Sequence, residues 1–262
     1  MGTFEALILG IVQGATEFLP ISSSGHLVLT GALLGVEEGG LLVEITLHTA
    51  TFLAVVVYFR GRIAWMAAGA SRRDEVGRRA RAWILWLLVG TLPAAAVGIA
   101  FRSPIEMAFR SPRSALLGLL ATGAILLSTR WSVSRRTDPA GPAALIMGAA
   151  QALAILPGIS RSGSTIAAGM WSGVEKSEAA EFSFLLSLPA IGGAALLQGA
   201  DLLGGGVPGA AGMLPPLAVG FAAAFAAGYA AIAGLLEVLR RRGLVPFAWY
   251  CWALGVAGLL LV

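Results

Sequence analysis

Charged residues and cysteine are both scarce in this 262-residue chain, and each scarcity excludes a class of protein. Lys, Arg, Asp and Glu together make up 12% of the residues, about half the fraction usual in a soluble domain. The single cysteine, Cys251, allows neither a disulfide framework nor a cysteine metal site within one chain. No basic patch with interleaved aromatic residues accompanies the net charge of +4, which argues against nucleic acid as a partner.

Hydrophobic residues, at 57% of the chain, form runs long enough to cross a bilayer. A spanning helix needs roughly 17–25 mostly apolar residues. The first apolar run contains Glu5 and Glu17 and has no basic segment before it, so we expect no cleaved signal peptide. We predict six membrane spans, of which the third is the shortest, at about Leu41–Phe59, Ala82–Phe101, Ser114–Thr129, Ala179–Gln198, Leu217–Leu239 and Leu244–Val262.

Two further apolar regions, at about Phe4–Gly35 and Pro142–Gly173, are interrupted in the middle by short polar motifs. Each half of these regions is too short to cross a membrane on its own. Irregular backbone at membrane depth is tolerated where it is buried in protein or lines a cavity. We therefore expect two re-entrant helical hairpins with polar tips, and polar groups placed at such a depth usually serve a function.

Basic residues fall mainly on one side of the membrane if the six spans alternate. Three of them, Arg102, Arg110 and Arg113, fall on the other side, and Arg161 belongs to no loop because it lies inside the second hairpin. The positive-inside rule makes the richer side cytoplasmic. The fourteen basic residues on that side are Arg60, Arg62, Arg72, Arg73, Arg78, Arg79, Arg81, Arg130, Arg135, Arg136, Lys176, Arg240, Arg241 and Arg242.

The two halves of the chain carry matching motifs. The segments Gln13–Gly25 and Gln151–Gly163 have the same length, and each contains a proline followed by serines. Each half holds one hairpin and three spans, and because three is odd the second copy must have the opposite topology. We therefore expect an all-α polytopic membrane protein built from an inverted repeat, residues 1–137 and 138–262, with the hairpin tips meeting near the midplane.

The second motif, Pro157–Thr165, carries groups that bind phosphate. The guanidinium of Arg161 stays charged and can bind phosphate bidentately, and glycines at 158 and 163 let the backbone approach a ligand. The alternative is that Arg161 only neutralises a buried carboxylate such as Glu17. The hydroxyl residues around the arginine favour phosphate, and they are Ser160, Ser162, Ser164 and Thr165.

The first motif offers oxygen ligands. Gln13 and Glu17 are four residues apart and therefore share one helix face. Carboxylate and amide oxygens suit Mg²⁺ or Ca²⁺ bridging to a diphosphate. The alternative, that Glu17 balances the charge of Arg161, is compatible with a metal site.

The serine cluster Ser22, Ser23 and Ser24 supplies a nucleophile or ligands, and His26 supplies a general acid or base. Serines beside glycine also occur where membrane helices pack together, and a histidine can form a hydrogen bond that closes a turn. These structural roles remain alternatives for the serine cluster and for His26.

Three other polar residues at membrane depth have structural interpretations. Glu44 and Glu181 open the first span after each motif, and we expect them to support the hairpins by accepting hydrogen bonds from the loops. His48 lies inside a span, and because no serine cluster surrounds it we expect it to be structural.

Together the two motifs resemble those of the undecaprenyl-diphosphatase family, the bacitracin-resistance type of integral-membrane phosphatase. One is a Glu/Gln-x-x-x-Glu element followed by Pro-x-Ser-Ser-x-Gly-His, here Gln13 to His26, and the other is Pro-Gly-x-Ser-Arg-Ser-x-x-Thr, here Pro157 to Thr165. The sequence after the second motif, from Glu181, is also similar, and the resemblance covers nearly the whole chain. Gln13 stands where many members have glutamate.

The resemblance implies hydrolysis of undecaprenyl diphosphate to undecaprenyl phosphate and inorganic phosphate, which recycles the lipid carrier for cell-wall polymers and confers bacitracin resistance. It also implies dependence on a divalent cation, Mg²⁺ or Ca²⁺. The expected location is the bacterial inner membrane, with membrane lipids as neighbours and the active site open to the periplasmic face. A homodimer is an allowed assembly state that the sequence does not decide.

Carried onto this chain, the resemblance assigns roles to individual residues. Glu17 with Gln13 would handle the metal, and Arg161 would clamp the diphosphate. Ser23 would be the nucleophile and His26 the acid or base, with water or histidine as other attacking groups. Serine and threonine hydroxyls would surround the phosphates, at Ser22, Ser24, Ser160, Ser162 and Thr165. A transporter or flippase for an anionic polyprenyl lipid is the alternative function, because inverted repeats with broken helices are a transporter design.

Overall fold

The computed structural model describes residues 1–36, 40–109, 111–205 and 210–261, and in these ranges it is helical without a β-strand element. The helices of the first half are α1 Thr3–Phe18, α2 Ser23–Leu34, α3 Gly40–Tyr58, α4 Arg60–Ala70, α5 Glu75–Ala100, α6 Arg102–Phe109 and α7 Pro112–Ser128, followed by the 3₁₀ turn η1 Thr129–Trp131. Those of the second half are α8 Pro142–Leu153, α9 Arg161–Trp171, α10 Lys176–Gly205, α11 Ala210–Arg242 and α12 Val245–Leu261.

Most of the predicted spans are present, and the protein is an all-α, multi-pass membrane protein. Among the described residues, four helical segments are long and apolar enough to cross a membrane, and α3 with α4, bent by 70°, makes a fifth if the pair is one span. The sixth predicted span is the 17-residue apolar helix α12, which is shorter than each of the four long segments. Arg110 and Val262 lie outside the described residues. The four long segments are Glu75–Ala100, Pro112–Trp131, Lys176–Leu197 and Gly212–Arg242.

Two helices, α4 and α6, lie where the sequence predicted loops. The basic residues at the start of α4 suggested a loop, but Arg62 donates to Glu181 on α10 and its guanidinium lies 4.7 Å from the centre of the Trp83 ring. A neutralised arginine packed on an indole can lie in a helix. Helix α5 also begins earlier than predicted, because Asp74 caps it by accepting a hydrogen bond from the Gly77 N–H at 3.0 Å.

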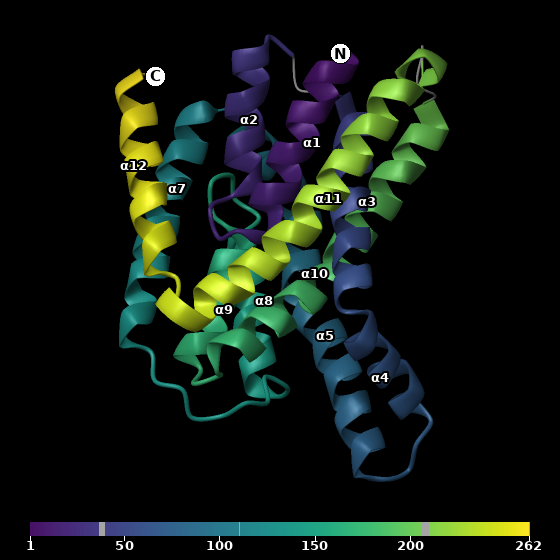
Figure 1. Cartoon of the computed structure of the whole chain (residues 1–262), viewed down its shortest axis with the longest axis vertical. Coiled ribbons are helices and arrows are strands. Elements are labelled where there is room, and N and C mark those ends of the chain that lie inside the picture. Colours follow the sequence, from purple (N-terminus) through teal and green to yellow (C-terminus); the bar gives the residue numbers. More distant parts are fainter. Residues whose placement is uncertain (37–39, 110, 206–209, 262) are drawn as a thin grey trace.

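Each predicted hairpin is a pair of helices, α1 with α2 and α8 with α9, and the two pairs approach from opposite ends. Figure 1 shows both chain termini at the upper end, together with the α1–α2 pair, and the α8–α9 pair in the lower half. The two connecting loops, residues 19–22 and 154–160, meet in the middle of the molecule. The Ser162 hydroxyl on α9 donates to the Leu19 carbonyl at 3.2 Å. The division into two repeats at residue 137 stays a prediction.

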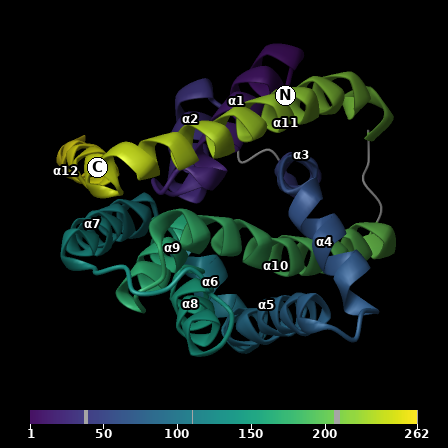
Figure 2. The same ribbon diagram turned by 60° about the horizontal axis from the view of Figure 1, so that its bottom comes forward.

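Glycines allow α1 to pack closely on α11, and the two helices lie side by side in Figure 2. A methyl group at Gly14 would lie 2.3 Å from the Ala224 carbonyl oxygen, and one at Gly10 would lie 2.3 Å from the Gly220 carbonyl oxygen. Small residues at such contacts drive helix association in membranes, where lipid removes most of the hydrophobic force between helices. This contact fixes α1, and therefore the residues in its last turn.

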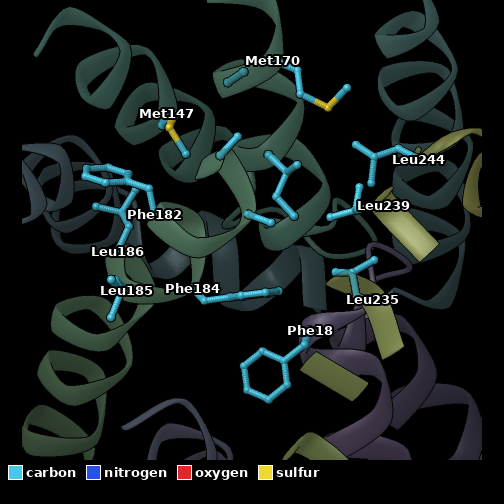
Figure 3. Close-up of a cluster of buried hydrophobic side chains, with 14 of the residues drawn as sticks. Phe18, Met147, Met170, Phe182, Phe184, Leu185, Leu186, Leu235, Leu239 and Leu244 are labelled. Carbon is cyan, nitrogen blue, oxygen red and sulfur yellow. The ribbon is translucent and has the colours of Figure 1, made fainter. Parts of the chain in front are cut away.

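A buried apolar cluster surrounds the inner end of α1. Figure 3 shows Phe18, Phe184 and Leu235 among its members. The Phe18 and Phe184 rings meet edge to face, with centroids 5.6 Å apart and planes at 89°. Such pairs contribute about 0.5–1.5 kcal/mol beyond their buried area. The cluster joins the last turn of α1 to α10, so that Glu17 is held against the second half of the chain.

Candidate functional site

Helix α1 ends beside Pro20, and the backbone then turns sharply into α2. A residue before proline disfavours helical backbone, and Leu19 is extended with ψ 140°. Ser22 has φ +67°, a left-handed conformation that is strained for a non-glycine residue. Its carbonyl accepts a hydrogen bond from Nδ1 of His26 at 2.8 Å. The turn sets Glu17, at the end of α1, opposite the serines that begin α2.

The loop before α9 is fastened to α7 through one threonine. The Thr122 hydroxyl donates to the Gly158 carbonyl at 2.9 Å and accepts from the Ser160 N–H at 2.9 Å. Ser160 caps α9 by accepting from the Gly163 N–H at 3.1 Å. Helix α9 therefore begins at Arg161, with its free N–H groups at the tip of the hairpin.

The two tips meet in an ion pair between Glu17 and Arg161. Nη2 of Arg161 donates to Oε1 of Glu17 at 2.6 Å, and the two side chains are only 17% and 7% exposed. Oε2 of Glu17 accepts from the Ser23 hydroxyl at 2.8 Å and from Nε2 of Gln13 at 3.1 Å. One carboxylate therefore holds both the arginine and a serine hydroxyl.

This ion pair is the alternative interpretation of Arg161 that the sequence left open. It does not use all the hydrogen-bonding atoms of the residues around it. Within the described residues, the buried Nη1 atom of Arg161 and the buried Oε1 atom of Gln13 have no hydrogen-bond partner. A buried polar atom without a partner is costly. Of these two atoms, Nη1 of Arg161 belongs to a residue that lines the cavity described below, where a ligand or water can complete it.

A cavity of about 170 Å³ lies at the junction of the two tips. Glu17 and Arg161 line it together with three serines of the first motif and Ser160 of the second. Its polar lining is Thr16, Glu17, Ser22, Ser23, Ser24, His48, Ser160 and Arg161, and its apolar lining is Phe109, Ala154, Ile155 and Ile159.

Three residues that the sequence assigned to the metal or the phosphates do not line this cavity. Gln13 lies one turn deeper in α1 and reaches the site only through Glu17. Ser162 is occupied with the Leu19 carbonyl, and the Thr165 hydroxyl is 2.5 Å from the Ser183 hydroxyl on α10. These side chains hold the tips in place rather than face a ligand.

The two histidines occupy positions that the sequence did not indicate. His26 does not line the cavity, and both of its ring nitrogens are bonded, Nδ1 to the Ser22 carbonyl and Nε2 to the Tyr250 hydroxyl, each at 2.8 Å. His48, which we expected to be structural, lines the cavity together with Glu17. Its Nδ1 donates to the Glu44 carbonyl at 3.0 Å, so Nε2 carries the lone pair of the neutral ring.

Among the residues that the structure describes, neither Glu44 nor Glu181 accepts a hydrogen bond from a hairpin loop, contrary to the expectation. The Glu181 carboxylate accepts from Nε of Arg62 and so ties α10 to α4. The Glu44 side chain is exposed, and its backbone carbonyl accepts from His48. The sequence could not show that Arg62, which is far from Glu181 along the chain, would bind its carboxylate in place of the hairpin loop.

Comparison with known proteins agrees with this arrangement of motifs. The family model described as bacitracin resistance protein BacA matches residues 6–257. This chain is a member of the BacA family. A BacA relative named undecaprenyl-diphosphatase, from Geobacter sulfurreducens, is 42% identical over 259 residues, covering 95% of this chain and 94% of its own. Proteins of the same name from Salinibacter ruber and Carboxydothermus hydrogenoformans are 39% and 41% identical over 274 and 271 residues, covering all of this chain and 100% and 98% of their own.

Proposed function

We propose that this BacA family protein hydrolyses undecaprenyl diphosphate to undecaprenyl phosphate and inorganic phosphate at the cavity between the two tips. The observation that carries the proposal is the Glu17 carboxylate, which binds the Ser23 hydroxyl and the Arg161 guanidinium at once. A site that only bound or carried an anion would need the arginine but no hydroxyl paired with a base. The transporter alternative is therefore not favoured.

The proposed reaction begins at Ser23. Its oxygen attacks the terminal phosphorus while Glu17 accepts the hydroxyl proton, and the bond from that phosphorus to the bridging oxygen breaks, releasing undecaprenyl phosphate. Water then attacks the phosphoserine, its proton goes to His26, and the proton held by Glu17 returns to the serine oxygen as inorganic phosphate leaves. The nitrogen of His26 that would accept this proton is Nε2, which bonds to Tyr250 outside the cavity lining in the resting structure, so this step requires that bond to open and the ring to turn toward the cavity.

Charge that develops on the phosphate oxygens needs fixed donors. Arg161 has a free Nη1, and the first N–H groups of α9 lie at the same tip. Among the hydroxyls, Ser22, Ser24 and Ser160 line the cavity and are the proposed phosphate ligands.

The donors at the cavity also fit a divalent cation of the Mg²⁺ or Ca²⁺ class. Glu17 would hold it directly, and Gln13 would orient Glu17. Mg²⁺ in proteins commonly uses one or two carboxylates together with substrate phosphates, which matches a cavity whose lining contains one carboxylate. The cation, when bound, would neutralise phosphate charge.

We also propose that the protein lies in the bacterial inner membrane with the cavity open to the periplasm. The arginine-rich segments support this orientation, because the α4–α5 loop and the segment after η1 lie at the end of the molecule opposite the two termini in Figure 1.

The test is release of inorganic phosphate by the purified protein in detergent, with undecaprenyl diphosphate and Mg²⁺ or Ca²⁺. We expect turnover by the wild type and by Arg113→Ala, which removes an exposed arginine, and none by Glu17→Ala or Arg161→Ala. A wild type that binds the lipid diphosphate but releases no phosphate would refute the enzymatic proposal.

A further inference from the structure

One wall of the cavity is apolar, and the proposed reaction at the phosphates does not use it. Phe109, the last residue of α6, lines this wall together with Ile155 and Ile159 from the α8–α9 loop. The lining of the same cavity includes Glu17 and Arg161. A cavity lined by both charged and apolar groups fits a ligand that changes from anionic to hydrocarbon over a few atoms.

The apolar wall continues outward along α5. The tip of the Ile155 side chain lies against Gly98, 3.8 Å from the position that a Cβ atom would take there. The residues on either side of this contact are large and exposed, Ile99 on α5 at 73% and Leu153 on α8 at 68%. Hydrocarbon that leaves the cavity beside Ile155 therefore meets further apolar surface.

The size of the cavity limits what it can enclose. A space of about 170 Å³ accommodates a diphosphate and the start of a chain but not a whole polyprenyl chain. The rest of the chain must therefore continue outside, in lipid or along the protein surface.

We propose that Phe109, Ile155 and Ile159 form the subsite for the first isoprene unit of the substrate, and that the chain leaves past Ile155 over the exposed apolar surface of α5 and α8. The proposal rests on the proposed function and adds a basis for specificity. Diphosphates without an isoprenoid chain bind the polar wall alone, whereas a lipid diphosphate also contacts the apolar wall.

The test compares a lipid substrate with a ligand that has only the head group. We measure kcat/KM for farnesyl diphosphate, and the inhibition constant of inorganic diphosphate, in wild type, Phe109→Ala and Ile159→Ala. One methylene group in an apolar pocket is worth about 10-fold or more in discrimination. We expect kcat/KM to fall about 10-fold while the inhibition constant of inorganic diphosphate stays unchanged.

Met107→Ala is the matched control, because Met107 is on the same short helix, is 65% exposed and does not line the cavity. We expect it to retain the wild-type kcat/KM. Equal losses toward the lipid and toward inorganic diphosphate, or no loss toward either, would overturn the isoprene subsite while leaving the hydrolysis intact. If the proposed function itself is wrong, the result differs: the wild type would then release no phosphate from farnesyl diphosphate or from undecaprenyl diphosphate.

Discussion

Replacing Arg161 by methionine removes the guanidinium and leaves the Glu17 carboxylate, 7% exposed, without its counter-charge. Breaking a buried ion pair by removing one partner costs about 3–5 kcal/mol, because the other charge stays buried. At about 2–4 °C per kcal/mol for a chain of this size, the Tm should fall by roughly 6–20 °C. Adding Glu17→Gln removes the stranded charge and keeps the side-chain shape, so the double variant should recover most of the lost stability.

The assay pairs thermal unfolding in detergent with release of phosphate from undecaprenyl diphosphate. We expect Arg161→Met to be unstable and inactive, and the double variant to be stable and inactive. Arg113→Met, at an exposed arginine, should match the wild type in both measurements. A double variant as unstable as Arg161→Met would show that the loss comes from packing and not from an unpaired charge. Turnover by the double variant would remove both residues from the chemistry.

Three further predictions follow from single contacts or from the donors at the site. Tyr250→Phe removes the hydroxyl that occupies Nε2 of His26, the nitrogen proposed to take the proton, so kcat should stay at or above the wild-type value; Tyr229→Phe, whose contact with Tyr58 is between rings, is the control, and a loss of kcat in Tyr250→Phe alone would contradict the argument. Gly118→Ala would place a methyl group 2.2 Å from the Pro157 carbonyl oxygen and should abolish phosphate release by displacing the loop, whereas Gly234→Ala, in open space, should be silent. Chelation of divalent cations should stop phosphate release and Mg²⁺ or Ca²⁺ should restore it, and persistent turnover in chelator would exclude the metal.

The hairpins and the meeting of their tips could be predicted because each depends on a local contrast in the sequence. A polar motif inside an apolar region can lie at membrane depth only where other parts of the protein shield it from lipid. Two such motifs in one chain can shield each other. The motif of one supplies a carboxylate at Glu17 and the motif of the other an arginine at Arg161, which neutralise each other. The pairing of the two hairpin tips could therefore be predicted from the charge and polarity of the motifs, without knowledge of how the helices pack.

Helices α4 and α6 could not be predicted in this way, because basic residues mark a segment between spans without showing whether that segment is helical. Arginine has a high helix propensity, and in α4 Arg62 also donates to Glu181 on α10. Helix α6 is short and polar at its start, and its importance lies in one residue, Phe109, which reaches the cavity. A sequence pattern shows which residues are apolar but not which of them faces a ligand.

The two histidines show the same limit at the site itself. His26 follows a serine motif and so indicated chemistry, yet its ring nitrogens bond to the Ser22 carbonyl and to Tyr250, and it does not line the cavity. His48 stands alone in an apolar helix and reaches the cavity because α3 packs between α11 and α10, which sets the face that it turns toward α1. That face depends on the close contact of α1 with α11, which the glycines of α1 permit. Which histidine lines the cavity is therefore decided by helix packing between distant parts of the chain, and the sequence next to each histidine does not indicate it.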